Sequence, residues 1–262
     1  MKTGRIAVVT GGARGIGKAI SQRLAEDGAT VVVADILLEQ ANETCKEFNE
    51  KGLKTVACQV DLGSKDSIKA LFDFTIEKFE KVDILVNCAA IQIRNAAENF
   101  KFEDWSKICD INLTSQWLTC QYAAKSMLKN GYGRIVCISS GTATRAQSHR
   151  SPYNITKAAV EGLARALGNE WARYGVNVNA VAPGWTLTDM VKAGIEAGLV
   201  KQDEILPMVP IGRFMEVSEV ANAVNFLASD EASGIVGQTL YCDGGGSIRC
   251  NNEPNFPLEM ID

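Results

Sequence analysis

A tyrosine and a lysine four residues apart carry the most specific chemical signal in the sequence. Tyr153 and Lys157 lie in the stretch YNITK, at the start of a segment with a helical pattern. Residues four apart share one face of a helix, so the phenol and the ammonium can point into one cleft. A free phenol loses its proton near pH 10, and a nearby cation favours the phenolate. The pair is therefore a candidate acid/base.

Two serines strengthen this interpretation, because a tyrosine–lysine pair alone also fits an ordinary solvated helix surface. Ser139 and Ser140 close an apolar, strand-like run that precedes the tyrosine. A hydroxyl at the end of a strand can donate a hydrogen bond to a carbonyl oxygen on which negative charge develops. Together these residue types indicate chemistry between a secondary alcohol and its ketone.

A glycine-rich turn near the amino terminus is a candidate phosphate-binding loop. The stretch TGGARGIG at 10–17 follows the first strand-like run and opens a helical segment. Glycines permit a tight turn and let a pyrophosphate approach the free N–H groups at the start of a helix. Such a stretch also serves as a plain turn elsewhere, but its place between a strand and a helix favours nucleotide binding.

An aspartate at the end of the second strand-like run bears on which dinucleotide binds. Asp35 lies about twenty residues beyond the glycine loop, where a carboxylate accepts hydrogen bonds from the adenosine ribose hydroxyls and repels a 2′-phosphate. Arg14 is a counter-signal, because a cation in the loop could pair with that phosphate. A solvated strand-end aspartate is the alternative. We expect NAD as the cofactor in preference to NADP.

The elements that must position these residues alternate along the chain. Strand-like runs occur at 6–10, 30–35, 55–61, 83–89, 134–139, 176–182 and 239–243. Helical segments fill the gaps at 15–27, 37–51, 65–79, 102–128, 153–173 and 217–228. Repeated strand–helix–strand units form a parallel sheet with right-handed crossovers. The sequence predicts an α/β fold, a doubly wound parallel sheet of about seven strands with helices on both faces and ligands at the carboxyl ends of the strands.

Composition narrows the class of protein further. The chain has 262 residues, 46% hydrophobic and 22% charged, and a net charge of −4 argues weakly against nucleic acid or a membrane surface as partner. No apolar run approaches the length of a membrane span, and no secretory signal begins the chain, so we expect a cytoplasmic protein. The eight cysteines form no CxxC pair and there is one histidine, so we expect reduced thiols and no metal site.

The order and spacing of short motifs resemble the classical short-chain dehydrogenases/reductases from about residue 4 to residue 248. The matching stretches are TGGARGIG at 10–17, VD at 60–61, NCAA at 87–90, INL at 111–113, ISS at 138–140, YNITK at 153–157, PG at 183–184 and DGG at 243–245. The resemblance implies one Rossmann-fold domain over 1–248, with a substrate lid near 188–212, and a homotetramer. Two departures stand out: NCAA replaces the family's NNAG, and the tail at 249–262 is longer than usual.

The resemblance also implies roles for individual residues. The implied catalytic tetrad is Asn112, Ser140, Tyr153 and Lys157, in which Ser140 matches better than Ser139 by its spacing from the tyrosine. Implied cofactor contacts are Gly11, Arg14, Gly15, Ile16, Gly17, Asp35, Asp61, Leu62, Asn87, Ala89, Tyr153, Lys157, Pro183, Gly184, Thr186 and Thr188. Expected substrate-binding residues are Ser140, Tyr153, Arg94, Thr142, Gln147, His149 and Trp185.

The loop before the tyrosine bears on the substrate. It is polar and cationic, whereas a steroid or long-chain pocket should be mostly apolar. Arg94, Arg145 and Arg150 could pair with a carboxylate or phosphate, although each also fits a solvated surface. We expect a NAD-dependent dehydrogenase of a small molecule, a polyol, sugar or sugar acid. The alternatives are a 3-oxoacyl-thioester reductase, a hydroxysteroid dehydrogenase, or a Rossmann-fold binding protein without catalytic activity. The intact tetrad argues against the binding protein.

Overall fold

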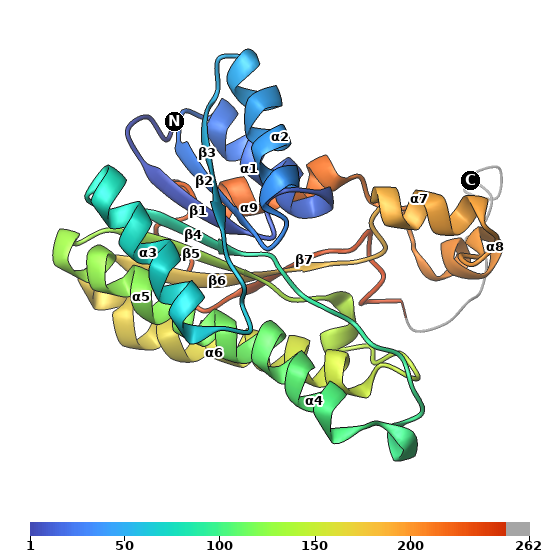
Figure 1. Ribbon diagram of the computed structural model, residues 1–262. Helices are drawn as coiled ribbons and strands as arrows, with labels where there is room; N and C mark the ends of the chain where they lie inside the picture. Colours follow the sequence, from blue (N-terminus) through green and yellow to red (C-terminus); the bar gives the residue numbers. More distant parts are fainter. Residues whose placement is uncertain (250–262) are drawn as a thin grey trace, which may run out of the picture.

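The computed structural model describes residues 1–249 and arranges them around a parallel sheet of seven strands (Figure 1). The strands are β1 (Ile6–Thr10), β2 (Thr30–Asp35), β3 (Lys54–Gln59), β4 (Ile84–Asn87), β5 (Gly133–Ile138), β6 (Val176–Pro183) and β7 (Thr239–Cys242). Their order across the sheet is β3-β2-β1-β4-β5-β6-β7, so the connections reverse direction between β1 and β4. The predicted doubly wound parallel sheet is confirmed.

The strands form where short β-branched runs can be buried on both faces. All five residues of β1 are buried, and Val8 pairs with Val32 of β2 on one side and with Leu85 of β4 on the other. Successive residues point to opposite faces, so Val8 and Val9 enter two different apolar cores. Parallel pairing leaves the carboxyl ends of all strands along one edge.

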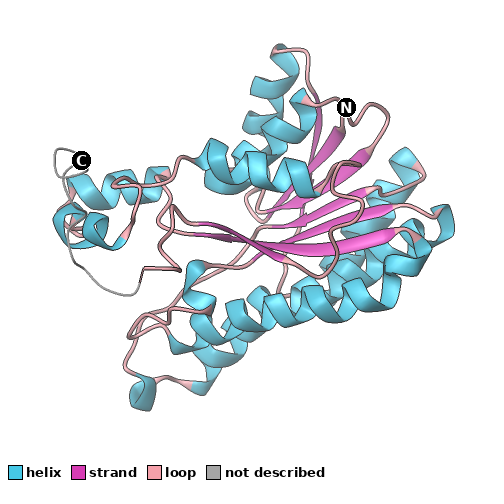
Figure 2. Cartoon of the chain, turned by 180° about the vertical axis from the view of Figure 1, so that it is seen from behind, coloured by secondary structure: helices cyan, strands magenta, loops and turns pink. Residues whose placement is uncertain are grey.

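Two groups of helices cover the two faces of the sheet (Figures 1 and 2). One face is covered by α1 (Gly15–Glu26), α2 (Leu38–Glu50) and α9 (Val217–Leu227). The other is covered by α3 (Lys65–Phe79), α5 (Ser115–Asn130) and α6 (Ser151–Trp171). Each helix buries an apolar stripe against the strands, as Ile20 and Leu24 of α1 do with no exposed surface. None of the helices in the described part of the chain is long and apolar enough to cross a membrane.

The segment expected to form one helix over 102–128 is interrupted. Helix α4 (Phe102–Cys109) continues into a π-helical turn, η2 (Asp110–Thr114), before α5 begins. A π turn accommodates one extra residue and redirects the side chains within it. Asn112 lies in this turn and is completely buried. A periodicity of about 3.6 residues does not reveal a single inserted residue, and for that reason the sequence predicted one regular helix.

A small helical subregion projects beyond the carboxyl-end edge of the sheet (Figures 1 and 2). It comprises α7 (Asp189–Glu196), α8 (Gln202–Ile205) and the short helix η5 (Leu206–Met208). Ile205, Val209 and Phe214 form an apolar cluster of its own, against which Trp185 packs. We call this subregion the lid, and it corresponds to the segment expected near 188–212. Residues 250–262, which make up nearly all of the expected tail, lie outside the described residues.

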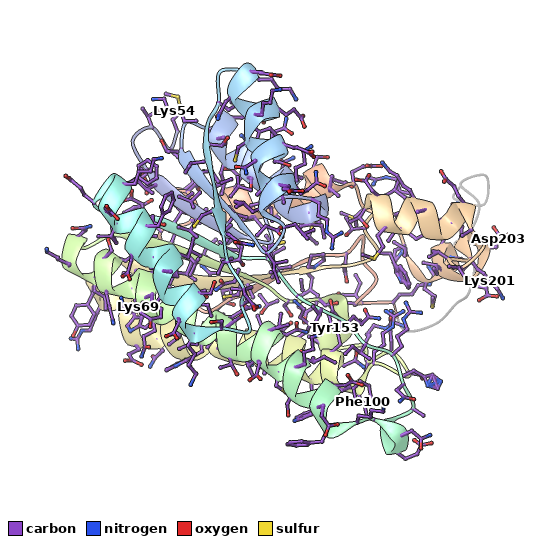
Figure 3. The ribbon with its side chains drawn as sticks, in the orientation of Figure 1. Lys54, Lys69, Phe100, Tyr153, Lys201 and Asp203 are labelled. Carbon is purple, nitrogen blue, oxygen red and sulfur yellow. The ribbon has the colours of Figure 1, made fainter. Side chains whose placement is uncertain are left out.

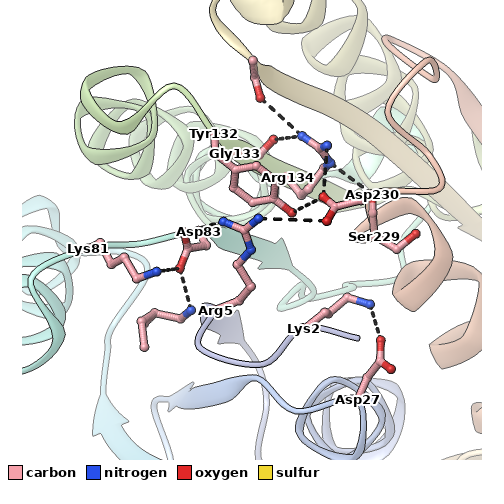
Figure 4. Close-up of polar contacts among 12 residues, drawn as sticks. Lys2, Arg5, Asp27, Lys81, Asp83, Tyr132, Gly133, Arg134, Ser229 and Asp230 are labelled. Carbon is pink, nitrogen blue, oxygen red and sulfur yellow. Dashed lines mark hydrogen bonds and ion pairs between the residues drawn. The ribbon is translucent and has the colours of Figure 1, made fainter.

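A cluster of charged side chains closes the opposite edge of the sheet (Figure 4). The ring of Tyr132 lies between two guanidinium groups, with Arg5 at 3.4 Å and Arg134 at 4.5 Å from its centroid. Its hydroxyl donates to Asp230 Oδ1 at 2.9 Å. Asp83 accepts from the backbone N–H of the first residue of β1 at 2.8 Å. The cluster therefore ties β1, the start of β4 and β5, and the turn after α9 to one another.

Removal of the Tyr132 hydroxyl tests this cluster through its pH dependence. Burial raises the pKa of Tyr132 to about 12, whereas an unfolded tyrosine ionises near pH 10. Between these two pKa values the folded protein keeps a proton that the unfolded chain loses. The contribution of Tyr132 to the free energy of unfolding therefore falls as the pH rises from about 10 toward 12. At pH 8, Tyr132→Phe should lower the free energy of unfolding by about 1 kcal/mol, the value of one hydrogen bond.

The difference between wild type and Tyr132→Phe should therefore shrink between pH 8 and about pH 10.5, near the unfolded pKa. Urea unfolding of both proteins at the two pH values measures it. The matched control is Tyr174→Phe, at a tyrosine that is 55% exposed, for which the difference from wild type should stay constant. A difference for Tyr132→Phe that grows with pH contradicts the prediction.

Candidate active site

A cavity of about 1120 Å³ opens at the carboxyl ends of the strands, between the sheet and the lid. In Figure 3, Tyr153 lies toward this edge, far from Lys54 and Lys69 at the other end of the molecule. The cavity is lined by many of the residues named from the sequence: Gly11, Arg14, Gly15, Ile16, Gly17, Asp35, Leu62, Ala89, Ser140, Thr142, Gln147, Tyr153, Lys157, Pro183, Gly184, Trp185, Thr186 and Thr188. The doubly wound topology explains this gathering, because residues after different strands meet at one edge.

The glycine loop is shaped by close backbone approaches that exclude any side chain. Gly11 has φ +65°, and a Cβ on it would lie 2.9 Å from the Cα of Ala89. A Cβ on Gly17 would lie 2.0 Å from the carbonyl oxygen of Gly11. Helix α1 begins at Gly15 with no side-chain cap, so its first N–H groups are available at the cavity wall. A pyrophosphate fits such a helix start.

Substitution of Gly17 tests whether the loop depends on this approach. Gly17→Ala forces the loop and the first turn of α1 apart, and we expect it to lower the free energy of unfolding by about 1–3 kcal/mol. The affinity for NADH should fall with it. The control Gly162→Ala adds a Cβ whose nearest neighbour is 3.9 Å away within α6, and should stabilise the protein by about 0.5–1 kcal/mol. Urea unfolding and NADH fluorescence measure both effects; equal behaviour of the two variants contradicts the prediction.

The carboxylate of Asp35 is fixed at one end of the cavity. It is 8% exposed, and its two oxygens accept hydrogen bonds from the backbone N–H groups of Ala13 and Leu37, each at 3.1 Å. The next two residues, Ile36 and Leu37, are apolar and 57% and 43% exposed. Neither of them supplies a cation that would pair with a phosphate. This end of the cavity therefore suits a neutral ribose diol, while Arg14 remains a cation in the adjoining loop.

Tyr153 and Lys157 lie one turn apart on α6, and both line the cavity. The lysine side chain is 1% exposed and lies 5.5 Å from the centre of the tyrosine ring. Its Nζ donates to the carbonyl oxygen of Ile138, at the end of β5, at 2.7 Å. The arrangement can support proton transfer to or from a bound molecule.

The two serines after β5 have different surroundings. Ser139 is buried, and its Oγ lies 3.0 Å from both the carbonyl oxygen of Lys157 and Oε1 of Glu161. Ser140 lines the cavity, and its Oγ accepts hydrogen bonds from the backbone N–H and the hydroxyl of Thr142, at 3.2 and 3.1 Å. Ser139 therefore joins β5 to α6, whereas Ser140 presents its hydroxyl to a ligand. Thr142 orients that hydroxyl.

Two asparagines among the expected site residues lie behind the cavity wall. Asn112 accepts from the N–H of Ile91 at 2.8 Å, and donates to the carbonyl of Ile91 at 2.9 Å and to Thr156 at 3.3 Å. Asn87 is 2% exposed and accepts from the hydroxyl of Thr119 at 2.8 Å. Their side chains are thus engaged with the protein. Asn112 holds the loop after β4 against α6, and Asn87 anchors the end of β4 on α5.

Three further residues named from the sequence do not line the cavity. Asp61 is exposed and accepts from the N–H of Gly63 at 2.8 Å within its own turn. Arg94 and His149 are exposed, and the backbone of His149 is left-handed, with φ +62°. Such backbone conformations are set by loop packing, which the sequence pattern does not show.

Several lining residues were not indicated by motifs. Met208 and Val209 come from the end of the lid, and Gly246 and Ser247 from the turn after β7. The guanidinium of Arg145 donates to the carbonyl oxygen of Gly246, so it joins the loop after β5 to that turn. The lid expected near 188–212 includes Met208 and Val209, and the DGG stretch at 243–245 marks the turn after β7. Neither signal shows which individual residues reach the cavity.

Cys88, one of the departures noted in the sequence, lines the cavity but is a poor nucleophile. Burial raises the pKa of its thiol to about 11, even though the charge of Lys157 acts in the opposite direction. The thiol therefore stays protonated near neutral pH, whereas nucleophilic attack requires a thiolate.

Within residues 1–249, no group of three or more His, Cys, Asp or Glu side chains is placed to hold a metal ion.

Comparisons with known proteins agree with this architecture. The family model described as enoyl-(acyl carrier protein) reductase matches residues 11–247. An NAD-dependent glycerol dehydrogenase from Listeria innocua is 37% identical over 247 residues, 94% of this chain and 95% of the relative. A 3-oxoacyl-[acyl-carrier-protein] reductase from Staphylococcus aureus is 35% identical over 246 residues, 94% of this chain and 99% of the relative.

A solved structure extends the likeness to three dimensions. The structure of a gluconate 5-dehydrogenase from Burkholderia cenocepacia, in complex with NADP and tartrate, has a TM-score of 0.88 and 33% sequence identity. The match covers 94% of this chain and 96% of that one. Chains of nearly equal length therefore share both the sheet and the region that carries the cavity.

Proposed function

We propose that this chain, which belongs to the classical short-chain dehydrogenase/reductase family, is a NAD(H)-dependent oxidoreductase. It would interconvert a secondary alcohol and its ketone on a polyol, sugar or sugar acid. The observation that carries the proposal is that Ser140, Tyr153 and the buried Lys157 meet in the cavity that also holds the glycine loop and Asp35.

The chain's own residues would move the proton and hold the substrate oxygen. In the direction of oxidation, Tyr153 Oη accepts the proton of the substrate hydroxyl, while Ser140 donates a hydrogen bond to the same oxygen. Lys157 lies one turn farther along α6, lines the same cavity and would place its ammonium group near the reacting atoms. A nicotinamide dinucleotide, which the glycine loop and Asp35 would hold, would supply the hydride acceptor for this oxidation. Asn112 would act as a positioning residue, because its side chain holds the loop at Ile91.

Tyr153→Phe tests this assignment directly. It removes the oxygen that transfers the proton, and general acid–base catalysis contributes about 10²–10⁴ in rate. We therefore expect kcat for a NAD-linked alcohol oxidation to fall by at least about 10²-fold, while the Kd for NADH stays within about threefold. A screen of polyols, sugars and aldonates supplies the substrate, followed by NADH absorbance. The control Tyr174→Phe, at an exposed position, should keep full activity; unchanged turnover in Tyr153→Phe refutes the assignment.

The preference for NAD over NADP rests on the end of the cavity near β2. The fixed carboxylate of Asp35 would accept hydrogen bonds from the ribose hydroxyls and repel a 2′-phosphate, and apolar Ile36 follows it. Arg14 acts against this preference, because it lines the same cavity. Relatives of both kinds exist, an NAD-dependent glycerol dehydrogenase and a gluconate 5-dehydrogenase in complex with NADP. The local geometry favours NAD in this chain.

A double substitution tests the cofactor preference. Asp35→Ala with Ile36→Arg removes the carboxylate and adds a cation beside the ribose. The Kd for NADH should rise by about 10- to 100-fold, the loss of a charged hydrogen bond, and the Kd for NADPH should fall. Fluorescence titration of wild type and variant with both nucleotides measures the exchange. Tighter binding of NADPH than of NADH by the wild type would overturn the preference for NAD.

A 3-oxoacyl-thioester reductase is the second candidate, favoured by the 35% identity to such an enzyme over nearly the full chain. The same titration separates the two, because we assign NADPH to that alternative and Asp35 opposes a 2′-phosphate.

We also propose that the protein forms a homotetramer. Apolar side chains exposed on α4, α5 and α6 support it: Phe102, Trp117 and Ile155 are 75%, 45% and 52% exposed.

A further inference from the structure

An arginine on the wall of the cavity is held close to the proposed reacting tyrosine. Arg150 occupies the position just before α6, three residues before Tyr153, and lines the cavity. Its side chain is half-buried, and its guanidinium lies 6.0 Å from the centre of the Trp185 ring. A planar cation beside an aromatic ring is fixed in orientation as well as in place.

Gln92, from the loop after β4, orients this guanidinium. With the amide turned so that its oxygen faces the two neighbouring arginines, that oxygen accepts from Nε of Arg150 and from Nε of Arg94, each at 3.1 Å. The Nε of each arginine is then engaged. Within residues 1–249, no protein group accepts a hydrogen bond from either Nη of Arg150, which lines the cavity.

No acidic side chain in the described part of the chain balances the positive charge of this cluster. Burial lowers the pKa of Arg150, and the neighbouring charge of Arg94 lowers it further. Neither arginine forms an ion pair with an acidic side chain among residues 1–249. Asp243, an acidic residue that lines the cavity, accepts from the backbone N–H groups of Gly245 and Ser247. Arg150 lines the cavity and has the exposed Arg94 beside it, so an anion bound at Arg150 would compensate the positive charge of both groups.

We infer that Arg150, oriented by Gln92, binds a carboxylate of the substrate, and that the substrate is therefore a small hydroxycarboxylate of the sugar-acid type. The inference rests on the proposed function, whose reacting hydroxyl would lie at Ser140 and Tyr153. Two Nη groups on one planar guanidinium match the two oxygens of a carboxylate. Arg150 precedes α6 and Tyr153 lies in its first turn, so a small molecule could reach both residues.

The test compares two probes that differ only at the anionic group. D-gluconate carries a carboxylate where D-glucitol carries a hydroxymethyl group. We measure kcat/KM for both with NAD, in wild type and in Arg150→Met, which keeps the apolar stem but not the charge. The ratio of gluconate to glucitol should fall by about 10- to 100-fold, since hydrogen bonds to charged groups have that value. Arg150→Lys should recover part of the loss. The matched control is Arg165→Met, at an exposed arginine farther along the same helix, which should leave the ratio as in wild type.

A binding measurement separates the failure of this inference from failure of the proposed function. Calorimetry follows gluconate binding to the NADH complex of Tyr153→Phe, which should not turn over, with and without Arg150→Met. Binding that depends on Arg150 supports the carboxylate site even if no alcohol is oxidised. Binding that does not depend on Arg150, an unchanged ratio in turnover, or no binding of gluconate at all overturns it. Tighter binding of D-glucitol 6-phosphate than of gluconate assigns the site to a phosphate and also overturns it.

Discussion

The structure depends most on one buried ammonium group at the carboxyl-end edge of the sheet. Lys157 is almost without exposure, and a charge removed from water costs several kcal/mol unless it is compensated. The carbonyl oxygen of Ile138 compensates one of its three donors at 2.7 Å. The other donors lie at a cavity wall shared with Tyr153, where oxygen atoms of a ligand can accept them. The packing that buries the lysine is therefore the packing that defines the site.

That burial is maintained by contacts well away from the reacting groups. The hydroxyl of Ser139 and the carboxylate of Glu161 form hydrogen bonds that hold α6 against β5, and Tyr241 of β7 donates to the same carboxylate at 3.0 Å. Asn112 holds the loop after β4 against α6 from the other side. Three strands and one helix are thus fixed relative to each other. The position of Tyr153 therefore depends on contacts that α6 makes with several strands and loops at this edge of the sheet.

The sequence predicted the features that arise from local residue patterns. It did not predict those that depend on the course of the backbone in loops and turns. Apolar runs and glycine positions gave the parallel sheet, and the spacing of Tyr153 and Lys157 placed both in one cavity. The π turn that buries Asn112 left no trace in the periodicity. Nor could the sequence tell which loop cations face inward. Arg150 lines the cavity while His149, its neighbour in the chain, adopts a left-handed conformation and is exposed.

Asp35 and Arg150 line different parts of the cavity and carry opposite charges. This difference bears on where each anionic ligand would bind. Asp35 presents a fixed carboxylate at the β2 end, and Arg150 presents a guanidinium near the lid. In the proposed arrangement, a diphosphate would bind at the N–H groups at the start of α1, because these favour negative charge. The carboxylate proposed for the substrate would bind at Arg150. Both ligands would carry negative charge, and separate positive sites would allow them to occupy one cavity together.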